Sequence, residues 1–350
     1  MINVRFAGES DSNAWDAYVH SHPDGSPYHL FAWGKAIEQA YNHKAYYFLA
    51  EQNQEVTGIL PAIQLRFPFI LNELVSLPFC DVGGCLSDNR EVLSAILSNV
   101  LSFAKHIKAN TIKLRGCNEI SQLRPFGFTE EKHDKARMLL DLPGSSEILM
   151  QGFKSKLRSQ INKAEKNDLI FQWGSENRLN DYYSVFSENM HALGSPVHAR
   201  KLFKAVLQLF GGNAKMGLVY YQDKAIGAGL MLMKGNSVSI PWASTLRDYN
   251  QLAPNMLLYW NFLKYAADNG YTMFDFGRSS KGEGTYKFKA QWGAKPHNLE
   301  WHSIAFNDKR SKIHSGKFLP SRDHLAKAWQ RVPLKLANYL GPKLRKFISL

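Results

Sequence analysis

An internal repeat limits what this chain can fold into more than any other feature of its sequence. Both halves show the same succession of segments: strand, turn, strand, a stretch with proline before an aromatic residue, helix and strand. In the first half these segments are 44–51, 52–55, 56–66, 74–79, 91–108 and 111–115. In the second half they are 215–221, 222–224, 225–234, 238–242, 255–269 and 271–276. The shared order predicts a duplicated structural unit.

The spacing of apolar residues supports the two helices. The residues at helical spacing are Leu93, Ile96, Leu97, Val100, Leu101 and Ala104, and then Met256, Tyr259, Trp260, Leu263 and Ala267. Pro254 marks the start of the second helix and Gly270 its end, and the alternating strand 273–276 ends at Gly277. Mixed strands followed by a single helix, twice over, predict an α/β or α+β fold with mixed central sheets.

A length of 350 residues suits two domains of average size. Residues 141–147, Asp-Leu-Pro-Gly-Ser-Ser-Glu, have the composition of a linker. We therefore expect domains at 1–145 and 146–308, followed by a basic helical tail at 309–350.

The net charge of +13 is concentrated in two segments. Residues 309–350 hold eleven Lys or Arg against Asp323 alone, and residues 153–166 hold five against Glu165 alone. The rest of the chain is nearly neutral, so the basic segments point to anionic partners at defined places.

The three cysteines, Cys80, Cys85 and Cys117, lack the paired spacing of a zinc site. We expect them to be small buried residues in a reducing compartment, and we expect no metal site. Residues 1–16 carry charges and no apolar signal-peptide core, and no stretch reaches the ~18 apolar residues of a spanning helix. The sequence therefore predicts a chain on the cytoplasmic side.

The segment 274–293, which follows a predicted strand, is the strongest candidate for chemistry. It holds four glycines and four basic residues. Loops after strand ends commonly bind ligands in α/β proteins, and Gly282 and Gly284 would allow close backbone approach. The alternative is a glycine-rich hairpin with solvated lysines.

Within this segment, Phe288-Lys289-x-x-Trp292-Gly293 resembles the FK-x-x-[FW]-G signature of the Fem family of peptidoglycan-bridge aminoacyltransferases. The chain is most similar to the branch of that family that accompanies PEP-CTERM exopolysaccharide and exosortase loci. The motifs that carry this further resemblance are Leu77-Pro-Phe-x-Asp81-x-Gly-Gly84, Met190-x-x-Leu-Gly-Ser-Pro196 and Pro241-Trp-Ala-Ser244. The resemblance extends from about Tyr28 to Trp301.

The resemblance implies two acetyltransferase-like (GNAT) domains and a reaction in which an amine attacks the ester of an aminoacyl-tRNA. The tetrahedral oxyanion needs a positive charge or an N–H donor, and the resemblance gives this role to Lys289, helped by the backbone N–H near Phe288. If the segment is extended, Lys287 points the opposite way. Asp275 would orient the amine or accept its proton; the alternative is an ion pair with Arg278.

Further residues become candidates for binding the substrate. The guanidinium of Arg278 could hold a phosphate or carboxylate in bidentate fashion. The other candidates are Lys287, Tyr286, Phe288, Trp292, Trp242, Ser244, Asn255, Tyr259 and Asp81. For the large aromatic residues, packing in the core is the alternative.

No tightly bound cofactor is expected. Enzymes that use acetyl-CoA hold its pyrophosphate on the backbone N–H groups of a [RQ]xxGx[GA] loop, and the corresponding stretch 246–254 has no glycine. Acetyl-CoA is therefore disfavoured, and an aminoacyl-tRNA or another acyl donor stays open. The basic amphipathic helix 153–166 is followed within a few residues by Trp173, which leaves no room for the long helical arm that tRNA-using Fem enzymes can carry. That departure argues against tRNA specifically.

In the tail, apolar residues recur at helical intervals among the cations, with prolines at 333 and 342. They are Leu325, Trp329, Val332, Leu336, Tyr339, Leu340, Leu344 and Phe347. A cationic amphipathic segment of this kind is typical of an interfacial anchor on anionic lipid. A soluble or RNA-contacting extension is the alternative.

Three functions are compatible with these features. The leading hypothesis is an acyl- or aminoacyltransferase that forms an amide on an amino group of a cell-envelope or exopolysaccharide precursor, at the inner face of the plasma membrane. A nucleic-acid-binding module would use the two basic segments, but these lack interleaved aromatic residues for base stacking. A non-catalytic assembly factor that kept the fold is the third.

Overall fold

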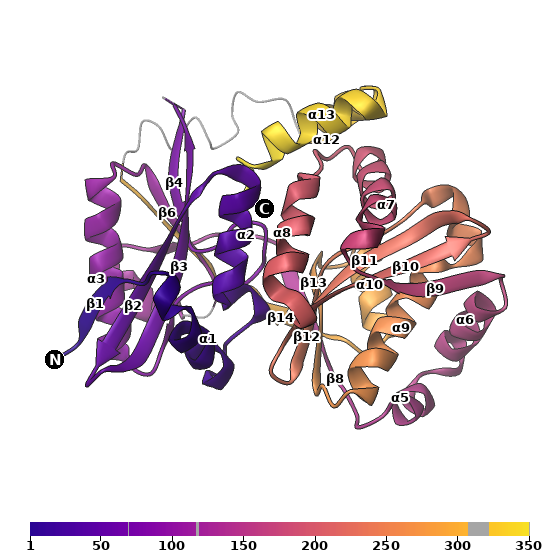
Figure 1. The fold of residues 1–350 in the computed structure, drawn as a ribbon, viewed down its shortest axis with the longest axis horizontal. Helices are drawn as coiled ribbons and strands as arrows, with labels where there is room; N and C mark the ends of the chain where they lie inside the picture. Colours follow the sequence, from indigo (N-terminus) through magenta and orange to yellow (C-terminus); the bar gives the residue numbers. More distant parts are fainter. Residues whose placement is uncertain (69, 117–118, 307–321, 350) are drawn as a thin grey trace. The chain divides into compact units, whose positions relative to one another are not determined.

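The computed structural model describes residues 1–68, 70–116, 119–306 and 322–349, and they form two compact units (Figure 1). The N-terminal unit comprises Met1–His133, Leu299–Arg322 and Leu344–Leu350, and the C-terminal unit comprises Asp134–Asn298 and Asp323–Lys343. Each unit has a mixed sheet of its own. The predicted α+β class with two mixed central sheets is confirmed.

The sheet of the N-terminal unit has the strand order β1-β2-β3-β4-β6-β15-β7, with β5 beside β3. The strands are β1 (Asn3–Phe6), β2 (Lys44–Gln52), β3 (Glu55–Phe67), β4 (Leu71–Val75), β5 (Leu86–Ser87), β6 (Thr111–Arg115), β7 (Thr129–Glu130) and β15 (Trp301–Ala305). The helices are η1 (Glu9–Asp11), α1 (Ser12–Ser21), η2 (Pro27–His29), α2 (Phe31–Tyr41), α3 (Arg90–His106), α4 (Ile120–Leu123) and η3 (Arg124–Phe126). Strands β4 and β6 are parallel, and the other neighbouring strands are antiparallel.

The sheet of the C-terminal unit has the order β14-β8-β13-β12-β11-β10-β9. The strands are β8 (Lys135–Asp141), β9 (Leu169–Gly174), β10 (Ala214–Tyr221), β11 (Lys224–Lys234), β12 (Ser237–Thr245), β13 (Met273–Ser280) and β14 (Lys295–Asn298). The helices of its main body are α5 (Ser146–Gly152), α6 (Ser155–Glu165), η4 (Glu176–Arg178), α7 (Leu179–Ala192), α8 (Arg200–Phe210), η5 (Gly211–Asn213), η6 (Arg247–Leu252), α9 (Pro254–Asp268) and α10 (Gly284–Gln291). Here β12 and β13 are the parallel pair.

The predicted repeat is present in three dimensions. The series β2, β3, β4, α3 and β6 recurs as β10, β11, β12, α9 and β13, with the parallel pair at the same place in each series. The repeat also extends further back than the sequence indicated, because β1, α1 and α2 have counterparts in β9, α7 and α8. A shared order of this length supports duplication of one structural unit over chance similarity.

Strand pairing places the boundaries of the two units away from the predicted 145/146 and 308/309. Strand β8 precedes the predicted linker but pairs with β13, and β15 follows the C-terminal unit in sequence but pairs with β6. The predicted linker is itself ordered, since Ser146 donates from its backbone N–H and its hydroxyl to Asp268 at 2.7 and 2.9 Å. Strand pairing between distant segments, which composition does not record, sets these boundaries.

Packing on the sheets follows the predicted periodicity. In α3 the buried side chains include Val92, Ile96 and Val100, which join the core of the N-terminal sheet. Cys80 and Cys85 are buried in this unit, as expected. The third cysteine, Cys117, lies outside the described residues.

The two basic segments contain helices where the structure describes them. In α6 the buried side chains are Leu157, Ile161 and Ala164, and β9 begins four residues after the helix ends, so no long arm is present within the described residues. In the tail, α12 (Arg322–Gln330) and α13 (Leu334–Arg345) are formed, and Pro342 lies inside α13 instead of interrupting it. Among the residues that the structure describes, no helix is both long and apolar enough to cross a bilayer.

Two buried histidines make the stability of the N-terminal unit dependent on pH. Burial lowers the pKa of His302 and of His43 below the ordinary value of 6.5. Below that pH the two histidines bind protons in the unfolded chain more readily than in the folded unit. The free energy of unfolding should therefore fall as the pH drops from neutral to about 5. Chemical denaturation across this range should show the decrease, and His302→Phe should reduce it. An unchanged pH dependence in that variant would contradict the assignment.

Candidate functional site

The candidate site lies in the C-terminal unit, where β12 and β13 run parallel and then part. Their register joins Ser237 to Met273 and Ser239 to Asp275. Beyond Asp275 the ladder between β13 and β8 is irregular and resumes at Arg278 opposite Arg137. The sequence predicted that the strand ends at Gly277, but β13 continues through a bulge to Ser280, just beyond the end of the parallel ladder. Bulges are common next to functional side chains.

Gly277 forms the centre of this bulge. Its φ of 72° is in the left-handed region, which favours glycine. Its N–H donates to Asp275 Oδ1 at 2.8 Å, and its carbonyl accepts a hydrogen bond from Lys289 Nζ at 3.1 Å. Lys289 Nζ also donates to the carbonyl of Arg278 at 2.8 Å. Asp275 and Lys289, the two residues predicted to be catalytic, thus hydrogen-bond to the N–H and to the carbonyl of the same glycine.

Lys289 comes from a helix, and the extended conformation considered for this segment is wrong. Helix α10 runs from Gly284 to Gln291, and the side chain of Lys289 is only 8% exposed. Lys287 is exposed, because two residues along an α-helix rotate a side chain by about 200°. The predicted difference between the two lysines therefore holds, for a helical instead of an extended backbone.

Asp275 is paired with Arg137, not with Arg278 as the alternative reading proposed. Arg137 Nε donates to Asp275 Oδ2 at 2.7 Å. The side chain of Asp275 is 4% exposed and that of Arg137 is 24% exposed. Sequence reasoning missed Arg137 because it lies before the predicted linker. The alternation of polar and apolar residues in 135–138 was the available signal for a strand there.

Basic side chains share one face of the edge strands. Arg278 is opposite Arg137, and His297 of β14 is opposite Arg137 on its other side. Lys135 is opposite Ser280 and its ammonium donates to the serine hydroxyl. Directly opposed residues in antiparallel strands lie on the same face of the sheet. This face, with Asp275 among several cations, suits an anionic substrate group.

The aromatic candidates belong mainly to the packed core. Trp292 and Tyr259 are buried, and the ring of Phe288 packs against Tyr259 at 5.2 Å between centroids. Phe153 adds an edge contact to Trp292 at 5.6 Å. Burial raises the pKa of Tyr259. For Tyr259 and Trp292 the structure shows the core-packing alternative. Tyr286, on the same helix, is partly buried.

Two of the remaining candidates, Ser244 and Trp242, contact residues in or next to helices α7 and α8. Ser244 accepts a hydrogen bond from Asn189 Nδ2 at 3.0 Å, and Trp242 packs on His198 and Phe203 at 5.5 and 5.1 Å. Both therefore face the α7–α8 side of the sheet. Asn255 is partly buried in the first turn of α9.

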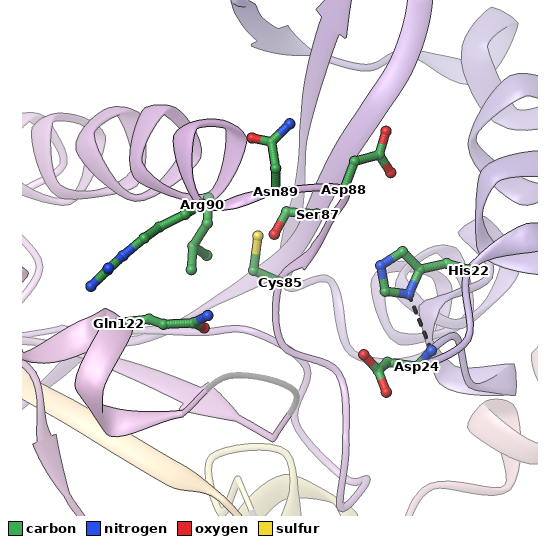
Figure 2. Close-up of a pocket in the computed structure, with 9 residues that line it drawn as sticks. His22, Asp24, Cys85, Ser87, Asp88, Asn89, Arg90 and Gln122 are labelled. Carbon is green, nitrogen blue, oxygen red and sulfur yellow. Dashed lines mark hydrogen bonds between the residues drawn. The ribbon is translucent and has the colours of Figure 1, made fainter.

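Asp81 lies in the N-terminal unit, where its backbone carbonyl accepts a hydrogen bond from Trp301 Nε1 at 2.9 Å. That unit also contains a polar pocket of about 220 Å³ at the start of α3 (Figure 2). None of the predicted site residues lines it. Its polar groups are largely engaged: Asn89 caps α3 by accepting from Glu91 and Val92, and His22 accepts from the Asp24 N–H.

Comparisons with known proteins agree with this fold. The family model of the acetyltransferase (GNAT) domain matches residues 151–290. The Lipid II:glycine glycyltransferase of Staphylococcus epidermidis is 20% identical over 372 residues, which cover 79% of this chain and 87% of the relative.

Solved structures show the same architecture. FemX superimposes with a TM-score of 0.72 at 16% identity, covering 89% of this chain and 99% of FemX. The tandem GNAT protein from the clavulanic acid biosynthesis pathway superimposes with a TM-score of 0.57 at 9% identity, covering 87% and 98%. Both structures cover nearly nine-tenths of the chain and show the same tandem GNAT fold. The chain thus has two domains of the GNAT fold, and its residues 151–290 match the acetyltransferase (GNAT) domain.

Proposed function

We propose that the chain transfers an acyl or aminoacyl group to an amino group of a cell-envelope or exopolysaccharide precursor and so forms an amide. The amine nitrogen bonds to the ester carbonyl carbon, and the carbonyl oxygen takes up negative charge. The bond to the ester oxygen then breaks, and the departing alcohol takes the proton that the amine loses. The main energetic cost is the formation of this oxyanion, which a positive charge at a fixed position stabilises.

One observation carries the proposal: the buried ammonium of Lys289 is held at a fixed place beside the bulge in β13. An ammonium has three N–H donors, and two of them point at the neutral carbonyls of Gly277 and Arg278. A charged acceptor binds such a donor more strongly than a neutral one. In our proposal the oxyanion replaces one of these carbonyls as the acceptor.

Asp275 has a positioning role in this proposal. One of its oxygens accepts from Arg137 and the other from the Gly277 N–H. Because each carboxylate oxygen already accepts a hydrogen bond, we propose that Asp275 holds the bulge in shape instead of accepting a proton from the amine. Arg278 and the other cations of the edge strands are proposed to bind an anionic part of the acceptor.

For the acceptor, the support comes from similarity. The staphylococcal relative is named as acting on lipid II, and the motifs at Leu77–Gly84, Met190–Pro196 and Pro241–Ser244 resemble the branch found with exopolysaccharide loci. We therefore propose an amino-bearing, lipid-linked or nucleotide-linked sugar, modified at the cytoplasmic face of the membrane.

For the donor, the start of α9 argues against acetyl-CoA. Pro254 is its first residue and has no N–H. The N–H groups of Ala253 and Met256 are bonded within the turn, to Asn250 and Ala253 at 3.0 Å each. A pyrophosphate at a helix start needs several free N–H groups. We propose an aminoacyl-tRNA or another activated acyl ester as the donor. Because α6 is short, we favour a donor that can bind without the long helical arm that tRNA-using Fem enzymes can carry.

The test is a transfer assay with the purified chain. Aminoacyl-tRNAs, acyl thioesters and acetyl-CoA would each be offered together with amino-sugar lipids and their nucleotide-linked forms, and amide products detected by mass spectrometry. We expect an amide from at least one activated acyl donor other than acetyl-CoA. Turnover with acetyl-CoA alone would refute the donor assignment. Salt-sensitive RNA binding without any transfer would favour a nucleic-acid-binding module instead.

A further inference from the structure

Four large apolar side chains stand exposed where the end of the chain meets the β3–β4 hairpin of the N-terminal unit. Phe67 and Ile70 in the hairpin are 42% and 62% exposed, and Leu344 and Ile348 near the C-terminus are 49% and 42% exposed. The rings of Phe67 and Phe347 are in contact, with centroids 5.1 Å apart, so the two segments lie side by side. We call these five residues the apolar patch.

The apolar patch is held by a well-defined backbone. The carbonyl of Ser349 accepts from the N–H of Phe79 at 2.8 Å, and its hydroxyl accepts from Arg115 Nη2 at 3.0 Å. The carbonyl of Lys346 is 2.8 Å from His43 Nε2. The C-terminal segment is therefore docked on the unit while its leucine and isoleucine side chains still face outward. Fraying of the chain end does not account for their exposure.

Cations surround the apolar patch. Arg66 precedes the hairpin tip and is exposed, and Arg345 and Lys346, which flank the C-terminal apolar residues, are partly exposed. From residue 344 to residue 350 the sequence has no acidic residue. The occupant of this surface must therefore accept both apolar side chains and positive charge.

We infer that the apolar patch docks the chain on an anionic lipid surface. Aliphatic side chains enter the acyl boundary of a bilayer while Lys and Arg remain at the anionic headgroups. Nucleic acid would match the charge and could stack on the exposed ring of Phe67, but bases stack on aromatic rings and gain nothing from the aliphatic side chains of Ile70, Leu344 and Ile348. A second copy of this chain would bring like charges together. The inference does not depend on the transfer reaction.

Binding of the full chain to vesicles tests whether the apolar side chains of the patch contribute to lipid binding. Vesicles rich in phosphatidylglycerol would be compared with pure phosphatidylcholine vesicles by sedimentation. Ile70→Glu and Ile348→Glu should each lower binding to the anionic vesicles by about tenfold or more. Ile148→Glu, at an exposed isoleucine of α5, is the matched control and should bind like the unchanged chain. Equal losses in all three variants, or none in any, would overturn the inference.

The cations are tested in the same assay. Arg66→Gln and Lys346→Gln should each reduce binding about fivefold, whereas Lys156→Gln and Lys163→Gln on α6 should have little effect. Raising the salt from about 0.1 M to about 1 M should weaken binding, because it shortens the Debye length from about 10 to about 3 Å. Equal binding to neutral vesicles, or a dimer in solution that Ile70→Glu dissociates, would refute the lipid assignment. A transferase-inactive Lys289→Met chain should still bind the vesicles.

Discussion

Replacing Lys289 by Met should lower turnover by about 10²- to 10³-fold, the usual loss when a single oxyanion donor is removed. The variant should also unfold more easily, by about 1–3 kcal/mol, because the carbonyls of Gly277 and Arg278 lose their buried donor. Steady-state kinetics and chemical denaturation measure the two effects separately. The loss should appear in kcat more than in KM, since the proposed interaction forms only with the charged intermediate.

Two further variants separate catalysis from structure. Lys287→Met removes an exposed charge from the same helix and should leave turnover unchanged. Gly277→Ala places a side chain at a φ of 72°, which should strain the bulge by about 1–2 kcal/mol while the ammonium stays in place. If Gly277→Ala loses as much turnover as Lys289→Met at equal stability, the ammonium only holds the bulge, and the proposed role of Lys289 is wrong.

Replacing Arg137 by Met should destabilise the C-terminal unit by about 3–5 kcal/mol, the range for a buried ion pair that loses one partner. The reason is the unequal burial of the pair: Asp275, at 4% exposed, would be left as a charge without its guanidinium, whereas Arg137, at 24% exposed, can reach water. Asp275→Asn should therefore cost less than Arg137→Met. Denaturation curves of the two variants decide the order.

The double variant Asp275→Asn with Arg137→Met is the control for this pair. Once both charges are gone, no isolated charge is buried, and much of the loss should be recovered. Additive losses would mean that the two side chains act independently and that the 2.7 Å contact contributes little. The same double variant also tests positioning, because a shifted bulge should lower kcat even when stability is recovered.

The repeat and its consequences could be read from the sequence. Apolar spacing located α3 and α9, and the shared order of segments indicated two similar units, because helices and strands impose periods of 3.6 and 2 on any sequence that buries one face. The FK-x-x-W-G motif selected the segment that holds Lys289. Composition placed the charge in two segments, which contain helices α6, α12 and α13 where the structure describes them.

The tertiary structure alone decided which residues meet. The sequence, through local apolar patterning, determined two α+β units and the segment that contains Lys289. It did not determine that β8 crosses to the sheet of β13, that Arg137 therefore becomes the partner of Asp275, or that Lys289 holds the carbonyls of a bulge. These facts follow from pairing between strands more than a hundred residues apart, and backbone hydrogen bonds are the same for every residue type, so no local pattern records them.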